Sequence, residues 1–207
     1  MFDSHFILKT FVSIFIIVDP IGLIPSFITL TNHYSPQKIK RTVWEASLTL
    51  MVVLALFTLW GNAILRIFGI SLPAFRVAGG AILFMVSWEM LQAKRTRLKT
   101  SPEEEAYTQV QEDIGIVPLG VPMLAGPGAI TNVMVLGGES YPLGKVIILC
   151  AVFLTTISTF LILRYASILA RILGQTGLLV MTRLMGLLLA GIAFQFVFDG
   201  IKFGLLS

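Results

Sequence analysis

Two proline-containing interruptions lie inside apolar segments of this 207-residue chain. The first is Val18–Gly22 (VDPIG) and the second is Ala125–Ala129 (AGPGA). Proline removes a backbone donor and clashes with the preceding helical turn, so neither segment is expected to be one continuous helix. In lipid each unsatisfied backbone group costs several kcal/mol, so such breaks persist only where protein or a water-filled cavity covers them. Matching breaks in two halves of a membrane protein are typical of a transport site.

The chemistry available at these breaks is that of helix ends. The half-helix after each break is expected to begin at Pro20 or Pro127, because proline suits the first helical position. Asp19 can cap the first of them. A helix N-terminus presents free N–H groups and about half a positive charge, which suits a carboxylate. The carbonyl groups freed before each break suit an ammonium group, so the pair of breaks predicts a cavity for a small zwitterion.

We therefore predict a substrate-binding site made from both breaks and the turn after the second. The glycines would let backbone approach a ligand closely. A carboxylate near the bilayer centre is costly and by default functional, although Asp19 can also serve as a helix cap alone. Thr131 and Asn132 would line the cavity or instead form interhelical hydrogen bonds. The predicted binding residues are Asp19, Pro20, Ile21, Gly22, Gly126, Pro127, Gly128, Ala129, Thr131 and Asn132.

The elements that would position this site are six apolar segments. The chain is 56% hydrophobic and 13% charged, with a mean hydropathy of +0.90, which indicates an integral membrane protein in one domain, residues 1–207. A spanning helix needs about 17–25 such residues. The expected spans are 6–30 broken at Asp19–Pro20, 46–68, 75–91, 117–136 broken at Gly126–Pro127, 146–165 and 182–203.

The two halves of the chain resemble each other. One ungapped offset of 107 aligns Pro20 with Pro127, Arg76 with Arg183, and Gly79 with Gly186. Three spans per repeat is an odd number, so the second copy must be inverted relative to the first. The expected fold is thus an all-α membrane protein of two inverted three-helix repeats, about 1–91 and 115–207, with helices 1 and 4 broken near mid-membrane. Chance similarity between apolar segments is the alternative explanation.

The basic residues predict the orientation. A polar linker, about 92–114, joins the repeats, and the linker side of the predicted topology carries ten Lys and Arg residues against five on the opposite side. Basic residues concentrate on the cytoplasmic side, so the linker is expected in the cytoplasm and both termini in the periplasm. The same rule explains the net charge of +4 without nucleic-acid binding.

Other residue types exclude further functions or concern packing. His5 and His33 lack Cys or acidic partners at ligand spacing, so no metal site is expected. Neither a metalloprotease, a nucleophile-elbow nor a phosphate-loop motif is present, and we expect neither an enzyme nor a cofactor. Cys150 is expected to be a small buried residue. Four glycines are expected to permit close helix contacts, namely Gly79, Gly80, Gly186 and Gly191.

Four runs resemble the MarC family of bacterial inner-membrane proteins, also known as the small neutral amino acid transporter (NAAT) family. They are Asp19–Phe27, Pro118–Thr131, Arg183–Leu189 and Asp199–Ile201. The resemblance covers nearly the whole chain. It implies six spans in a bacterial inner membrane and transport of a small neutral amino acid such as glycine or alanine. Leu23 departs from the pattern, because many relatives carry Asn there.

The leading interpretation is a secondary transporter or exporter of small neutral amino acids. Its partners would be the amino acid, a coupling proton or sodium ion and the lipid bilayer, and a homo-oligomer is compatible with this plan. One alternative is a passive channel or facilitator for small solutes. Another is a membrane scaffold that transports nothing and whose breaks serve packing alone. Uphill transport driven by a proton or sodium gradient would separate the first hypothesis from the second. Loss of flux on altering either break, with the protein still inserted, would separate both from the third.

The orientation is testable by cysteine labelling. In a Cys150→Ala background, Thr100→Cys should be protected from a membrane-impermeant maleimide in intact cells and should react after permeabilisation. A cysteine added before the first span should show the reverse. Labelling of position 100 from outside intact cells would overturn the orientation.

Overall fold

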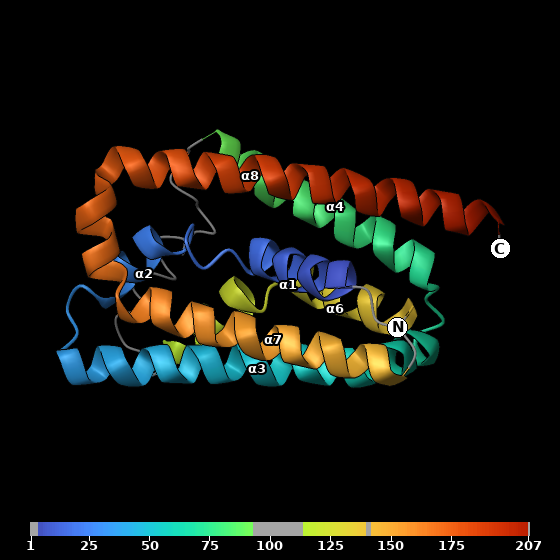
Figure 1. Cartoon of the computed structure of the whole chain (residues 1–207), viewed down its shortest axis with the longest axis horizontal. Coiled ribbons are helices and arrows are strands. Elements are labelled where there is room, and N and C mark those ends of the chain that lie inside the picture. Colours follow the sequence, from blue (N-terminus) through green and yellow to red (C-terminus); the bar gives the residue numbers. More distant parts are fainter. Residues whose placement is uncertain (1–3, 93–113, 140–141, 207) are drawn as a thin grey trace.

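The structure is a computed structural model that describes residues 4–92, 114–139 and 142–206, and each element in these ranges is helical (Figure 1). Most of the predicted linker falls outside the described residues. The elements are α1 (Ser4–Val18), α2 (Ile24–Thr31), α3 (Pro36–Ile67), α4 (Leu72–Leu91), the π-helical η1 (Gly115–Leu124), α6 (Pro127–Glu139), α7 (Pro142–Arg164) and α8 (Ala166–Leu206).

The prediction of an all-helical membrane protein is confirmed. Within the described residues, α3, α4, α7 and α8 are each long and apolar enough to cross a bilayer. The pair η1 and α6 meets the same criterion as a span bent by 59°. The first predicted span is divided into α1, with 15 residues, and α2, with 8. Length and composition therefore support four spans, or five with the bent pair.

Two predicted spans are longer at their N-termini than expected. Helix α3 begins at Pro36 rather than 46, because Ser35 Oγ accepts a hydrogen bond from Lys38 N at 3.3 Å and Pro36 occupies the first helical position. Its first turns are polar, so a prediction based on hydropathy placed the start of the helix too late. Helix α8 begins at Ala166 rather than 182, and it is bent at Gly174, whose φ of 65° takes the left-handed region that glycine tolerates.

The helices form three layers (Figure 1). Helices α3 and α7 run in opposite directions along one side, and α4 and α8 run in opposite directions along the other. Between these pairs lie α1, α2, η1 and α6; α1, α2 and α6 contact both pairs, and η1 contacts α3. The start of α1 and the end of α8 lie at one end of the molecule, and the end of α4 and the start of η1 lie at the other.

Close approach at glycines joins α4 to its neighbours. A Cβ atom at Gly80 would lie 2.8 Å from Ala193 O, and one at Gly186 would lie 2.9 Å from Met90 Cβ. A Cβ atom at Gly79 would collide with Thr131 of α6. The predicted close contacts are thus confirmed at three glycines. The prediction is wrong for Gly191, where no heavy atom lies within 4 Å of the Cβ position.

The expectation for Cys150 is wrong, and the two aligned arginines differ in burial. Cys150 is exposed on α7 rather than buried, and α7 lies in an outer layer (Figure 1). Arg76 is only 5% exposed, and its guanidinium carbon lies 5.6 Å from the ring centroid of Phe203. The residue aligned with it, Arg183, is exposed. The two arginines therefore have different surroundings despite their equivalent sequence positions.

Two glycines of α8 provide a matched stability test. A Cβ atom at Gly200 would lie 2.6 Å from Val77 Cγ2 and 2.8 Å from Pro73 O, whereas Gly191 faces open space. Gly200→Ala should lower the free energy of unfolding by about 1–3 kcal/mol, the usual cost of overpacking. Gly191→Ala should leave it unchanged or raise it, because alanine favours helix over glycine by about 1 kcal/mol. Thermal unfolding in detergent would measure both, and equal midpoints would contradict the described α4–α8 contact.

Candidate functional site at the paired helix breaks

The first break is a turn capped by its own carboxylate. Asp19 ends α1 with a φ of 45°, a conformation that a short polar side chain tolerates. Its Oδ1 accepts a hydrogen bond from Gly22 N at 3.1 Å, and its carbonyl accepts one from Leu23 N at 3.3 Å. These bonds have the pattern of an N-cap, but they close the turn that precedes α2. The N-cap residue of α2 itself is Leu23, which makes no side-chain cap, so Asp19 caps the turn and not the second half-helix as expected.

The regular helix after this break begins later than predicted. Helix α2 begins at Ile24 rather than at Pro20, because Ile24 N bonds to Ile21 O at 3.1 Å and so closes a tighter turn first. Gly22 has a steric role in that turn, since a Cβ atom there would collide with the Asp19 carboxylate. The five residues between α1 and α2 thus form a compact turn around one acidic side chain.

The second break is longer than predicted. Helix α6 begins at Pro127, as expected. However, Val117 and Val121 upstream have extended backbone conformations inside η1. Each precedes a proline, and the residue before a proline is disfavoured in the helical region. The backbone hydrogen bonds there join residues five apart, as in a π-helix, for example Ala125 N to Gly120 O at 2.9 Å.

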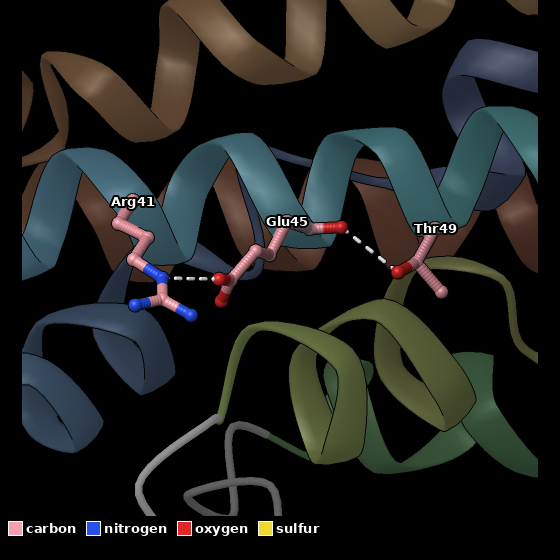
Figure 2. Close-up of polar contacts among 3 residues, drawn as sticks. All are labelled: Arg41, Glu45 and Thr49. Atoms are coloured by element: carbon pink, nitrogen blue, oxygen red, sulfur yellow. Dashed lines mark hydrogen bonds and ion pairs between the residues drawn. The ribbon is translucent and has the colours of Figure 1, made fainter.

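Glycines hold η1 against α3. A Cβ atom at Gly115 would lie 2.7 Å from Glu45 Cβ, and one at Gly120 would lie 2.7 Å from Thr49 Cβ. Figure 2 shows the side chains of Arg41, Glu45 and Thr49 on the side of α3 that faces η1. There Arg41 Nε lies 2.6 Å from Glu45 Oε1, and Thr49 Oγ1 donates to Glu45 O at 2.8 Å. The irregular segment is therefore covered by protein on this side.

The N-terminus of α6 has no side-chain cap among the described residues. Gly126 precedes Pro127 and offers only its carbonyl, which accepts from Ile130 N at 3.0 Å. Proline has no N–H, so the free donors of this first turn are those of Gly128 and Ala129. Within the described ranges, no side chain accepts a hydrogen bond from either. The two breaks thus differ, because an internal carboxylate occupies only the first.

The two breaks lie close together in the central layer. A Cβ atom at Gly128 would lie 3.6 Å from Ile17 Cγ2, one residue before the end of α1, and would collide with Leu83 of α4. At Gly126 it would lie 2.7 Å from Pro122 O. In the described conformation, therefore, Gly128 is buried and Gly126 is partly covered by the preceding segment. The first turn of α6 packs directly against the segment that leads into the first break.

Beyond its first turn, α6 carries two buried polar side chains. Thr131 Oγ1 donates to Pro127 O at 2.8 Å. Asn132 is 1% exposed, and its Oδ1 accepts from Ser13 Oγ of α1 at 3.2 Å. Its Nδ2 is buried and has no hydrogen-bond partner among the described residues. The interhelical bond expected as one role of Asn132 is therefore present, and its amide keeps an unused donor.

The ten predicted residues differ in burial. Pro20, Gly128, Ala129, Thr131 and Asn132 are buried, Asp19, Ile21, Gly22 and Gly126 are half-buried, and Pro127 is exposed. Sequence reasoning missed Ser13 and four buried hydroxyl groups that lack partners among the described residues, those of Thr10, Ser47, Thr155 and Thr159. The last two are four residues apart in α7, a spacing that places them on one helix face and would have indicated a shared polar stripe.

The whole chain matches one protein family. A family profile described as "MarC family integral membrane protein" matches residues 4–205. The chain belongs to the MarC family. This membership confirms the resemblance carried by the two break motifs, and both breaks lie inside the matched region.

Curated relatives agree over nearly their full lengths. A UPF0056 membrane protein of Aquifex aeolicus is 38% identical over 195 residues, which cover 94% of this chain and 91% of the relative. The UPF0056 membrane protein YhcE of Escherichia coli is 36% identical, covering 97% and 94% respectively. A UPF0056 membrane protein of Methanocaldococcus jannaschii is 38% identical, covering 99% and 100%. No solved structure matches this chain.

The contact between Gly128 and Leu83 can be tested by a double-mutant cycle. Gly128→Ala should lower the free energy of unfolding by about 1–3 kcal/mol, because the new methyl group meets Leu83. Leu83→Ala removes a buried side chain and should cost about 2–5 kcal/mol. The double variant should lose about 0.5–3 kcal/mol less unfolding free energy than the sum of the two single variants, because the truncation at Leu83 makes room for the new methyl group.

The control for this cycle pairs Gly128→Ala with Leu187→Ala, which truncates an exposed leucine of α8. Those two changes should be additive in thermal or denaturant unfolding. Additivity within about 0.5 kcal/mol for the Gly128 and Leu83 pair as well would show that Leu83 does not cover Gly128.

Proposed function

We propose that this MarC-family protein is a bacterial inner-membrane secondary transporter or exporter of small neutral amino acids, such as glycine or alanine. In this proposal α1, the capped turn and α2 together form a sixth span. The chain then consists of two inverted three-helix repeats, with both termini in the periplasm. The site at the two breaks binds the substrate, and a proton or sodium ion supplies the driving force.

The contacts between helices support the repeat. Helix α3 contacts η1 and α6, and α7 contacts the counterparts α1 and α2. Likewise α4 contacts α6, and α8 contacts α1 and α2. The corresponding helices α3 and α7, and α4 and α8, lie side by side and run in opposite directions (Figure 1). Reciprocal contacts of this kind are expected of two copies related by a two-fold axis in the membrane plane.

The observation that carries the substrate proposal is the uncapped N-terminus of α6 in the central layer. Its free N–H groups at Gly128 and Ala129 suit a carboxylate, which the helix dipole also favours. The buried Asn132 Nδ2 offers one more donor a turn away. Asp19 uses Oδ1 for its cap and retains acceptor capacity for an ammonium group. A substrate that carries a carboxylate and an ammonium group on the same carbon, with a small side chain, fits this set of groups.

The small size of the substrate follows from the surroundings. Leu83 and Ile17 flank Gly128, so a ligand held by the first turn of α6 would contact these side chains. Each of them would have to move for a larger ligand. Asp19 is the only acidic residue among the predicted binding residues. It is therefore the group that we assign to ion coupling.

Asp19→Asn separates capping from charge. Asparagine and aspartate cap helices about equally well, so the unfolding midpoint should change little. Glycine or alanine uptake should fall about tenfold or more, because hydrogen bonds to charged groups contribute roughly 1.5–3 kcal/mol. Asp199→Asn is the matched control, since Asp199 accepts a bond from Gln195 outside the breaks at 2.9 Å, and its uptake should remain normal.

The measurement is uptake of radiolabelled glycine, alanine and serine into proteoliposomes with imposed proton or sodium gradients, at matched protein levels. Accumulation above equilibrium that requires a gradient would support a secondary transporter. Equilibration alone would identify a passive facilitator. The absence of flux for all three substrates, with correctly inserted protein, would contradict the proposal and leave the breaks with a packing role.

A further inference from the structure

A groove of about 170 Å³ lies between α3 and α7, apart from the helix breaks. Its walls are formed largely by apolar side chains, among them Leu48, Met51, Phe153 and Ile157, which are all exposed. At one end the ring of Trp44 meets that of Phe160 edge-on, with centroids 6.2 Å apart. Because these walls are exposed on two membrane-spanning helices, the groove opens toward the lipid.

Two cations lie at the Trp44 end of this groove. Lys40 precedes Trp44 by four residues and Arg164 follows Phe160 by four, so each shares a helix face with a groove residue. The two helices run in opposite directions (Figure 1), which places both cations at the same end, one turn beyond the ring pair. Both are exposed. Among the described residues, neither has an ion-pair partner.

The neighbouring acidic side chain points elsewhere. Glu45 is bonded to Arg41 on the side of α3 that faces η1 (Figure 2). It therefore leaves the charge of Lys40 and Arg164 uncompensated on the groove side. An apolar channel that ends at two unpaired cations matches the two parts of a phospholipid, its acyl chain and its phosphate. Basic pockets between membrane helices bind anionic headgroups in this way.

We propose that this groove is a binding site for an anionic phospholipid, with one acyl chain between α3 and α7 and the phosphate at Lys40 and Arg164. Charge also argues against a second copy of the chain as the occupant. A two-fold axis along the membrane normal would bring the same cations of two copies to the same depth, where like charges repel. A zwitterionic lipid such as phosphatidylcholine carries its own cation beside the phosphate and would leave net positive charge at Lys40 and Arg164.

Tryptophan fluorescence can report occupancy of the groove. The three tryptophans are Trp44, Trp60 and Trp88, so Trp60→Phe with Trp88→Phe leaves Trp44 as the reporter. Bilayers of phosphatidylcholine would contain small fractions of phosphatidylglycerol or phosphatidylcholine with brominated acyl chains, which quench fluorescence on contact. Trp44 should show an apparent association constant about fivefold or more higher for phosphatidylglycerol, since basic residues near the surface attract anionic lipid.

Two comparisons isolate the site. A variant that keeps only Trp60, which is exposed near the other end of α3, should be quenched equally by the two lipids. Lys40→Gln with Arg164→Gln should abolish the preference seen at Trp44. The matched control, Arg66→Gln with Lys202→Gln, removes the same charge from other exposed positions and should retain it.

The acyl-chain part of the proposal has its own test. Ile157→Phe should fill the groove and reduce quenching of Trp44 by phosphatidylglycerol to the level of phosphatidylcholine. Leu187→Phe, on an exposed position of α8, should not. Native mass spectrometry of the wild-type protein gives an independent measurement, in which phosphatidylglycerol adducts should outlast phosphatidylcholine adducts. Equal quenching and equal adduct survival for the two lipids, or a preference unaffected by removing Lys40 and Arg164, would overturn the proposal.

Discussion

The structure depends on one constraint, that backbone groups released at a helix break must find partners inside a membrane. Both breaks lie in the central layer, where the pair α3 and α7 covers one side and the pair α4 and α8 covers the other. The outer helices are long and continuous apart from the bend at Gly174. Irregular backbone is therefore confined to the place where protein surrounds it, and the outer pairs can face lipid with regular helices alone.

The two breaks differ in how far they meet this constraint, and that difference matters more than their similarity. At the first, the Asp19 carboxylate bonds to Gly22 N, so one acceptor of the site is already committed to the fold. At the second, Gly126 replaces Asp19 in the repeat alignment and supplies no side chain. The N-terminus of α6 consequently keeps free donors. An anionic group of a ligand is expected there, and the first break contributes negative rather than positive charge.

Residues with strong local rules were predictable from the sequence, and residues governed by packing were not. Proline placed the breaks and the start of α6 correctly, because it cannot continue a helix. The start of α2 was misjudged because a second tight turn at Ile21 to Ile24 precedes it. The extended conformations of Val117 and Val121 could have been predicted from the prolines that follow them. The apolar composition of the segment instead suggested a regular helix. The bond from Ser13 to Asn132 joins residues 119 apart, which no local pattern reveals.

The kinds of contact around α6 indicate where the site can open. Toward α3 the contacts include backbone, since a Cβ atom at Gly137 would lie 2.9 Å from Thr58 O, beside the side-chain contact of Met134 with Gly61. Toward α4 the contacts at Gly128 and Gly79 involve the side chains of Leu83 and Thr131. A side chain can change rotamer, whereas a backbone contact requires the movement of a whole helix. Access to the free N–H groups of α6 is therefore expected from the α4 and α8 side, while α3 retains η1 and α6.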